Sequence, residues 1–258
     1  MKNILPLLSI FILIGCKKNL NSNLIYEGEK HFKNIKQITF GGDNAEAYWS
    51  FDDKNLVFQS NYNEWGVECD QMFLMSVDES FELNTPKMLS TGDGRTTCSY
   101  FMPDNKHILY ASTHEDNILC PETPLRVNGN YVWPIYDSYD IYISDLDGNI
   151  VNKLTNEKGY DAEATVSPKG DKIVFTSDRS GDLELYTMNI DGSDVKQITN
   201  ELGYDGGAFF SPDGNKLIFR ASRPKSKEEI DEYKRLLSEG LVKPTEMELF
   251  ICDSDGSN

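Results

Sequence analysis

Histidine is scarce in this sequence of 258 residues, which contains only His31, His107 and His114. A Ser-His-Asp relay or a histidine-based zinc centre needs suitable partners around a histidine. The chain places His31 in an N-terminal tether, His107 in an expected strand and His114 in an expected loop. It also lacks Gly-x-Ser-x-Gly, His-Glu-x-x-His and phosphate-binding glycine motifs. We therefore predict no catalytic residue and no metal ligand from the usual signatures.

Positive charge is also in deficit. The sequence has 25 Lys and Arg residues against 42 Asp and Glu, a net charge of −17. Such a surface repels phosphate backbones, so nucleic acid is excluded as a partner. The charge suits a protein body that faces an aqueous, salt-containing compartment.

Long apolar runs are absent except at the N-terminus, where Ile4–Ile14 follows the positively charged Lys2. The run is too short to span a bilayer and is typical of a signal-peptide core. Its end, Leu13-Ile14-Gly15-Cys16, resembles the lipobox of bacterial lipoproteins. The resemblance implies a signal peptide at 1–15, lipidation of Cys16 and a polar tether at 16–35. An ordinary secretory signal with a chance cysteine is the alternative.

The residue after the predicted lipidation site is Lys17. In lipoproteins of this kind, an aspartate at that position favours retention in the inner membrane. The resemblance therefore implies an outer-membrane lipoprotein that faces the periplasm, held to the membrane through its acyl chains.

Cysteine is sparse beyond the signal region: only Cys69, Cys98, Cys120 and Cys252 remain. Export permits disulfides, but the sequence alone does not fix their pairing. Because Cys98 and Cys120 fall in the same repeat, we predict that these two pair. Cys252 lies in a strand pattern and is expected to be a small apolar residue of the interior.

What the sequence does contain is a repeat. A turn followed by a strand of branched apolar residues and an aromatic residue occurs four times, at 50–58, 102–110, 167–175 and 211–219. Phe175 and Phe219 lie 44 positions apart, as do Tyr142 and Tyr186. A fixed period of this size predicts a stacked or radial repeat architecture.

Residues 160–199 show the unit most clearly, with strand patterns at 163–166, 171–176, 183–188 and 195–199. Proline and glycine turns separate them, and Asp-Gly marks the last hairpin. Four antiparallel strands in roughly forty residues make a propeller blade. We predict an all-β propeller of four-stranded antiparallel blades with one short inserted helix.

The expected blades cover roughly 41–90, 92–155, 160–199 and 204–258. The last ends at the hairpin where its fourth strand should begin. Conversely, Lys36–Phe40 resembles a fourth strand without a blade before it. We therefore expect a propeller over 36–258 that is truncated from a six-bladed parent.

The motifs also carry a family resemblance. Ser211-Pro212-Asp213-Gly214, followed by apolar residues, an Asp-Gly turn and Lys-Gln-Ile-Thr, resembles the TolB-type, WD-repeat-like β-propeller. The segments 159–163, 203–207 and 220–224 are most similar to TolB-like lipoproteins of unestablished activity. The resemblance implies the fold over most of the chain and a scaffold that binds a protein or peptide of the cell envelope.

Two insertions interrupt the period: residues 114–138, rich in aromatics, and 226–241, which read as a short helix. Ser226 and Glu229 have the spacing of a capping box. Both insertions follow the second strand of a blade, so both should project from the same rim. They either build a binding surface or only cover the blades.

Acidic residues recur before the expected innermost strands, at Asp43, Asp93, Asp161, Glu163 and Asp205. At the mouth of a channel they could hold calcium, although turn residues that cap local backbone are the simpler interpretation. We predict no cofactor, with calcium as the alternative. The candidate binding residues are Tyr160, Asp161, Glu163, Tyr204, Asp205 and Trp133.

The resulting functional prediction is a non-enzymatic, lipid-anchored binding scaffold. One alternative is an enzyme that acts on a glycan or peptide at the channel mouth through Asp161, Glu163 and Asp205. Trp65, Tyr131 and Trp133 could stack on sugar rings, although aromatics more often pack beneath insertions. Another alternative is the propeller gate of a hydrolase whose catalytic domain is missing from this sequence.

Overall fold

The computed structural model describes residues 26–33, 35–76, 85–124 and 126–258. The predicted signal peptide, Cys16 and the first part of the tether lie outside the described residues. The chain divides into two units, 1–40 and 41–258. In the described part of the first unit no strand forms, and the Gln37 side chain donates to the Thr39 carbonyl over 2.7 Å. Among the described helices, none has the length and apolarity needed to cross a membrane.

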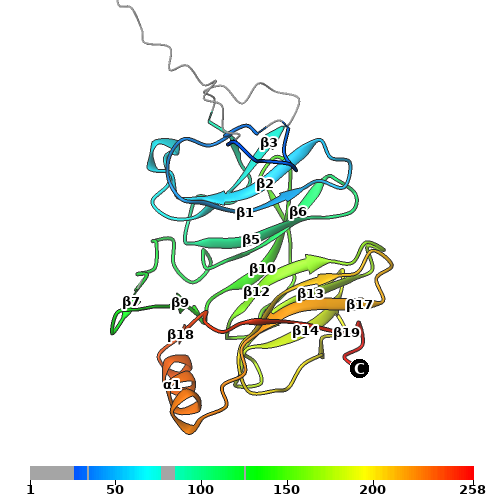
Figure 1. The fold of residues 1–258 in the computed structure, drawn as a ribbon. Helices are drawn as coiled ribbons and strands as arrows, with labels where there is room; N and C mark the ends of the chain where they lie inside the picture. The colour runs from blue at the N-terminus through cyan, green and yellow to red at the C-terminus, as the bar shows by residue number, and fades with distance from the viewer. Residues whose placement is uncertain (1–25, 34, 77–84, 125) are drawn as a thin grey trace, which may run out of the picture. The chain divides into compact units, whose positions relative to one another are not determined.

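The second unit consists mainly of antiparallel sheets, which we call blades 1 to 4 (Figure 1). Blade 1 contains β1 (Asn44–Trp49), β2 (Asn55–Ser60), β3 (Gln71–Ser76) and β4 (Lys87–Met88). Blade 2 contains β5 (Thr96–Phe101), β6 (His107–Ser112), β10 (Asp140–Asp145) and β11 (Ile150–Lys153). Blade 3 contains β12 (Asp161–Val166), β13 (Lys172–Ser177), β14 (Glu184–Asn189) and β15 (Lys196–Gln197). Blade 4 contains β16 (Asp205–Phe210), β17 (Lys216–Ala221) and β19 (Glu248–Asp253).

Neighbouring strands within each blade follow the order of the chain and run antiparallel. This is the connectivity of a propeller blade. The predicted fold class is therefore confirmed: an all-β, four-blade propeller arrangement with a single α-helix in the described part of the chain.

The turn between the first and second strands recurs in each blade. In blade 3 the Gly170 amide donates to the Ser167 carbonyl over 2.8 Å, and in blade 4 Gly214 donates to Ser211 over the same distance. Both glycines have a positive φ, near 70°. Blades 1 and 2 use Asp53 and Asn105 there, with φ of 57° and 54°. Aspartate and asparagine are the non-glycine residues that best tolerate this conformation, which explains why one turn accepts these sequences.

Side chains between adjacent blades form the core. Leu109 and Ile141 of blade 2 pack with Ile173, Phe175 and Met188 of blade 3. Third-strand aromatics occupy matching places, and three of the four are buried: Phe73, Tyr142 and Tyr186. These three aromatics belong to the hydrophobic clusters of the core. In blade 4 the equivalent aromatic, on β19, is 38% exposed.

The two insertions meet and form a cap, which we define as residues 126–136 and 226–242. The first insertion contains β7 (Arg126–Val127), β8 (Asn130–Tyr131) and β9 (Trp133–Pro134). The second contains α1 (Lys227–Ser238) and β18 (Leu241–Val242). Because β9 pairs with β18, the expectation that both insertions share one rim is confirmed (Figure 1).

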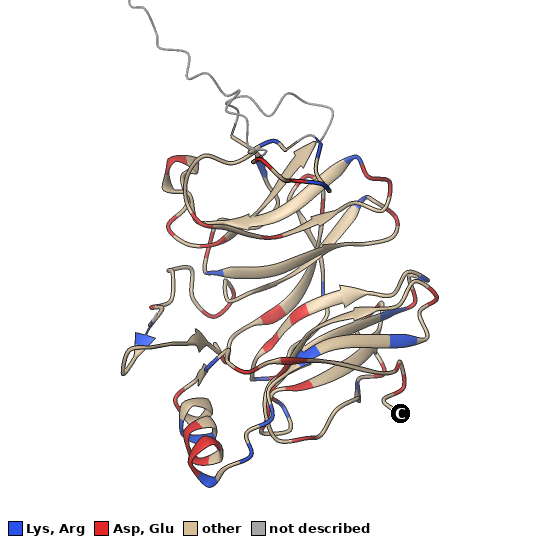
Figure 2. Cartoon of the chain, in the orientation of Figure 1, with Lys and Arg blue, Asp and Glu red and all other residues tan. Residues whose placement is uncertain are grey.

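The predicted helix in the second insertion is also confirmed. Ser226 is its N-cap, and both hydrogen bonds of the capping box with Glu229 are present. Tyr233 and Leu236 are the buried residues of α1, and Leu236 packs with Val132 of the first insertion. Acidic and basic residues both occur along α1 (Figure 2).

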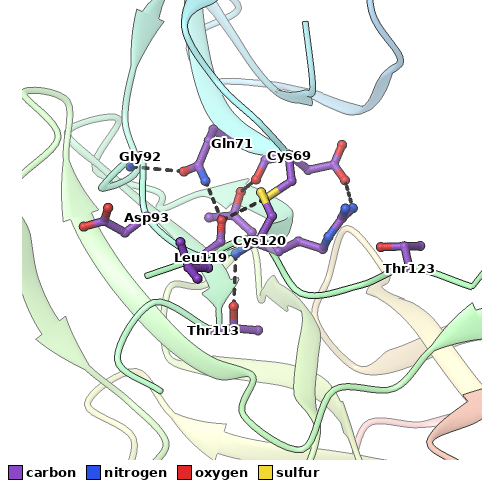
Figure 3. The surroundings of a disulfide bond; sticks show 12 residues. Cys69, Gln71, Gly92, Asp93, Thr113, Leu119, Cys120 and Thr123 are labelled. Carbon is purple, nitrogen blue, oxygen red and sulfur yellow. Dashed lines mark hydrogen bonds and ion pairs between the residues drawn. A yellow bond between two sulfur atoms is a disulfide. The ribbon is translucent and has the colours of Figure 1, made fainter. Parts of the chain in front are cut away.

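The predicted disulfide was wrong in one partner. Cys120 bonds to Cys69 of blade 1 (Figure 3). Cys98 is a free cysteine. The reason is geometric: Cys98 lies in the first strand of blade 2, whereas the loop that carries Cys120 returns to the β2–β3 connection of blade 1. The Gly94 amide, in the β4–β5 connection, also donates to the Ile118 carbonyl of this loop over 2.8 Å. The disulfide thus ties the first insertion to blade 1.

Candidate functional site

The first strand of every blade is interrupted at the same place. In β1, β5, β12 and β16 the pairing register shifts between the second and the fifth residue, as it does at a β-bulge. The third residue takes a positive φ in all four strands, between 50° and 59°; these residues are Glu46, Cys98, Glu163 and Gly207. The first strand of each blade therefore bends at its third residue, where a β-bulge interrupts the pairing with the second strand.

These four positions converge on a small cavity of about 30 Å³. Its lining also includes Ser99, Arg220 and the ring of Phe209. The volume is enough for about one water-sized molecule. The Ser99 hydroxyl is buried and has no hydrogen-bond partner among the described residues. We call this group of residues the axial cluster.

Glu163 is the most heavily bonded member of the axial cluster. Its Oε2 accepts from the Tyr204 hydroxyl over 2.6 Å and from the Gly207 amide over 2.7 Å. Its Oε1 accepts from the Tyr160 hydroxyl over 3.2 Å. Burial and the adjacent Glu163 carboxylate hold the pKa values of both tyrosines well above their ordinary range. The tyrosines therefore remain protonated donors.

Arg220 links the axial cluster to the cap. Its Nη2 donates to the Tyr204 hydroxyl over 3.2 Å and lies 3.6 Å from Glu163 Oε2. The guanidinium also lies 4.9 Å from the ring centre of Trp133, within cation–π range. Trp133 in turn packs edge-to-face against Tyr204 at 6.0 Å. The aromatic residue of the first insertion thus closes over the polar residues of blades 3 and 4.

The surroundings of Cys98 do not activate its thiol as a nucleophile. Burial, together with the Glu163 and Glu46 carboxylates, raises the pKa of its thiol well above the ordinary value. A thiol, unlike a thiolate, is a poor nucleophile. The cysteine at the axis is therefore unsuited to covalent catalysis at neutral pH.

The two predicted aspartates are engaged in ion pairs. Arg179 Nη2 donates to both Asp161 carboxylate oxygens, at 2.8 and 2.9 Å. At the equivalent position of blade 4, Arg223 Nη1 donates to one oxygen of the Asp205 carboxylate, Oδ1. Both carboxylates are almost fully buried, and burial raises the pKa of each. The two ion pairs therefore tie the start of β12 to the segment after β13 in blade 3, and the start of β16 to the segment after β17 in blade 4.

The other acids that we expected at the channel mouth do not join these residues. Asp43 and Asp93 are exposed. Among residues 26–258 with the stated gaps, no cluster of three or more His, Cys, Asp or Glu side chains is arranged to hold a metal ion. The calcium alternative stays a prediction.

The structure brings together four of the six predicted binding residues: Glu163, Tyr160, Tyr204 and Trp133. Asp161 and Asp205 belong instead to the arginine pairs. Sequence reasoning missed Glu46, Cys98 and Arg220 as members of the axial cluster. Aligning the third residues of the four first strands would have found Glu46 and Cys98, because these residues share one position of the repeat.

Comparisons with known proteins agree with this architecture. A family model described as the TolB beta propeller domain matches residues 134–243. The crystal structure of TolB from Acinetobacter baumannii superposes with a TM-score of 0.59 and 20% identity, covering 86% of this chain and 44% of that chain. A structure assigned to TolB from Agrobacterium tumefaciens has a TM-score of 0.43 and 21% identity, covering 84% and 79%. The chain thus spans less than half of the Acinetobacter protein, and that similarity shows the fold alone.

Proposed function

We propose that this chain, a TolB-like β-propeller, is a lipid-anchored scaffold of the cell envelope that binds a protein or peptide through its cap. Propellers host many unrelated tasks, so the fold by itself does not choose among them. The choice depends on the surface that the two insertions build.

The observation that carries the proposal is the junction of the two insertions. Elements from blades 2 and 4 pair through β9 and β18, and Trp133 connects them to the axial cluster. Beside this junction Tyr131 is 49% exposed. Aromatic side chains supported by a rigid framework are typical centres of protein interfaces.

The bonding of the acids supports binding over catalysis. A general acid or base needs a carboxyl group that is free to exchange a proton with a substrate. Glu163 is surrounded by donors from Tyr160, Tyr204 and Gly207. Asp161 and Asp205 are held by arginines. These contacts stabilise the blades and leave the acids poorly suited to acid/base work.

Photo-crosslinking tests the binding surface. A photoreactive residue at Tyr131 should capture a discrete, reproducible partner in native envelopes. The same residue at Phe51, a comparably exposed aromatic (41%) in the β1–β2 turn, is the matched control. Equal capture at both positions, or none at Tyr131, would contradict binding through the cap.

The anchor needs a separate experiment. Metabolic labelling with a fatty acid should mark the wild-type protein, whereas Cys16→Ser should be unlabelled and released from the membrane fraction. A Lys17→Asp variant should move the labelled protein from outer-membrane to inner-membrane fractions. Labelling that survives Cys16→Ser would rule out the proposed lipidation site.

A further inference from the structure

The loop that carries Cys120, residues 115–124, packs weakly against the rest of the fold. No residue of this loop is buried, and Ile118 and Leu119 are 66% and 64% exposed. The second insertion differs, because it buries Tyr233 and Leu236 of α1. A segment without buried apolar side chains gains little stability from packing. The order of the 115–124 loop therefore depends on its polar contacts and on the disulfide.

The two ends of this loop have polar contacts of their own. At its start, the Glu115 carboxylate pairs with Lys153 of β11 over 2.6 Å. At its end, the Tyr136 hydroxyl donates to the Glu122 carbonyl over 2.8 Å. The first contact is made with blade 2 and the second with the first insertion itself, so neither connects the loop to blade 1.

The middle of the loop contacts the rest of the fold through a hydrogen bond and through the disulfide. The hydrogen bond is the one from the Gly94 amide to the Ile118 carbonyl. The disulfide joins Cys120 to Cys69, in the β2–β3 connection of blade 1 (Figure 3). A neutral hydrogen bond contributes only about 1 kcal/mol net. The covalent bond is therefore the firmer attachment of the loop to blade 1.

The two sulfur atoms of the disulfide have different surroundings. Cys69 is 2% exposed, whereas Cys120 is half-buried in an exposed loop, so a thiolate from solvent reaches the Cys120 sulfur more readily. Cys69 Sγ lies 3.0 Å from the Gly94 carbonyl oxygen, which also accepts from the Gln71 side chain over 2.9 Å (Figure 3). After reduction, Cys69 can donate its S–H to that carbonyl. The buried thiol would therefore have a hydrogen-bond partner in the reduced protein.

We propose that the Cys69–Cys120 disulfide is a redox switch for the binding surface of the cap. A dithiol protein of the thiol–disulfide oxidoreductase class opens the disulfide, releases the 115–124 loop and weakens partner binding. The proposal rests on the proposed scaffold function and names a regulation of its site. The loop leads into the cap, which begins at residue 126, and Tyr136 of the cap holds the end of the loop. Because a released loop must be ordered again on binding, the partner binds the oxidised form more tightly.

The exchange needs no reactant besides the dithiol. A thiolate of the dithiol attacks the Cys120 sulfur, the bond to Cys69 breaks, and Cys69 leaves as a thiolate that takes a proton from solvent. The second thiol of the reductant then attacks the mixed disulfide and releases Cys120, which also ends as a thiol. The protein gains two electrons and two protons, and the dithiol becomes a disulfide.

The first test measures the loop in the full chain, with dithiothreitol as the dithiol. Reduction of the native protein should speed hydrogen exchange in residues 115–124 at least about tenfold and leave exchange in β12, β13 and β14 unchanged. A variant without the disulfide, Cys69→Ser with Cys120→Ser, should exchange fast in this loop with and without dithiothreitol. Two results would overturn the proposal: a disulfide that dithiothreitol opens only when urea unfolds the blades, or loop exchange that reduction does not change.

The second test measures binding through the cap. Capture of the partner by a photoreactive residue at Tyr131 should fall at least about fivefold after dithiothreitol. In the variant with both serines, capture should be low in either condition, which controls for an effect of the reductant on the partner. If reduction releases the loop but leaves capture unchanged, the switch is wrong and the scaffold function stands. If Tyr131 captures no partner in either redox state, the scaffold function is wrong and the regulation of binding fails with it.

Discussion

Blades 3 and 4 are two copies of one repeat that experience different surroundings. Val174 of β13 is fully buried, whereas Ile218, its equivalent in β17, is 44% exposed. On the third strands, Leu185 is fully buried and Leu249 is 74% exposed. The difference arises because blade 4 packs over this face of blade 3, where Val174 and Leu185 contact Ala208 and Leu217. Burial at a repeat position therefore depends on the neighbouring blade as much as on the residue.

On the side toward the axis the two blades remain alike. Both begin the first strand with a buried aspartate held by an arginine, Asp161 with Arg179 and Asp205 with Arg223. Both also bend the chain two residues later, at Glu163 and Gly207. The inner architecture is thus repeated, and the outer face of blade 4 differs.

The largest expected effect on stability distinguishes the third strand of blade 3, which is covered by blade 4, from the exposed third strand of blade 4. Leu185→Ala should lower the free energy of unfolding by about 2–5 kcal/mol, because it leaves a cavity between blades. Leu249→Ala should change it by no more than about 0.5 kcal/mol, as for an exposed site. Urea denaturation of both variants provides the measurement. Similar losses in the two variants would mean that blade 4 is covered in solution.

The second prediction concerns the likeness of the inner faces. Arg179→Met and Arg223→Met should each cost about 2 kcal/mol, because each leaves a buried carboxylate without its partner. The value is below that of a fully buried pair, since these arginines are 21% and 23% exposed. Lys216→Met, which removes an exposed pair with Asp253, is the control and should leave the free energy of unfolding nearly unchanged. Urea denaturation measures both losses. Clearly different losses in the free energy of unfolding for Arg179→Met and Arg223→Met would mean that the two ion pairs do not play equivalent roles in blades 3 and 4.

The comparison also shows what the sequence could predict. Blade number, strand order, the inserted helix and its capping box follow from local signals: alternating apolar residues, Pro-Gly turns and the Ser226–Glu229 spacing. Such signals depend on residues close together in the chain. They do not depend on what packs against the segment, so they predict the strands and turns of blade 4 as well as those of blade 3.

The disulfide and the axial cluster depend on contacts distant in sequence. Cys69 and Cys120 are 51 positions apart and come together only because the first insertion folds back onto blade 1. Arg220 reaches Glu163 and Trp133 across blade boundaries. No local sequence pattern predicts these long-range contacts. The sequence therefore indicated which types of residue occur at the site, but not which residues they contact.

The third prediction uses pH. Burial raises the pKa of Glu184 to about 8, and the nearby Asp205 and Asp182 carboxylates add to the rise. Between about pH 4.5 and 8 the folded protein therefore keeps a proton that the unfolded chain releases. The free energy of unfolding should fall as pH rises through this range, by at most about 1.4 kcal/mol per pH unit.

Glu184→Gln should flatten that fall in denaturation series from pH 5 to 8. Glu248→Gln, at the equivalent exposed position of blade 4, should leave it as in the wild type. Identical slopes for the wild type and Glu184→Gln would show that Glu184 is ionised in the folded protein throughout this range.

The smallest effect concerns the bend in the first strands, where blade 3 has Glu163 and blade 4 has Gly207. The φ of Gly207 is 59°, and a Cβ there would lie 3.0 Å from Arg220 Nε. Gly207→Ala should therefore cost about 1 kcal/mol. Glu163→Gly and Glu163→Ala both lose the carboxylate, so their difference isolates the backbone conformation, and the glycine variant should be the more stable by a similar amount. Matching values from urea denaturation would mean that both blades bend for the same backbone reason. A Glu163→Ala variant as stable as Glu163→Gly would instead mean that the bend in blade 3 costs no strain, and that glycine serves blade 4 only by making room for Arg220.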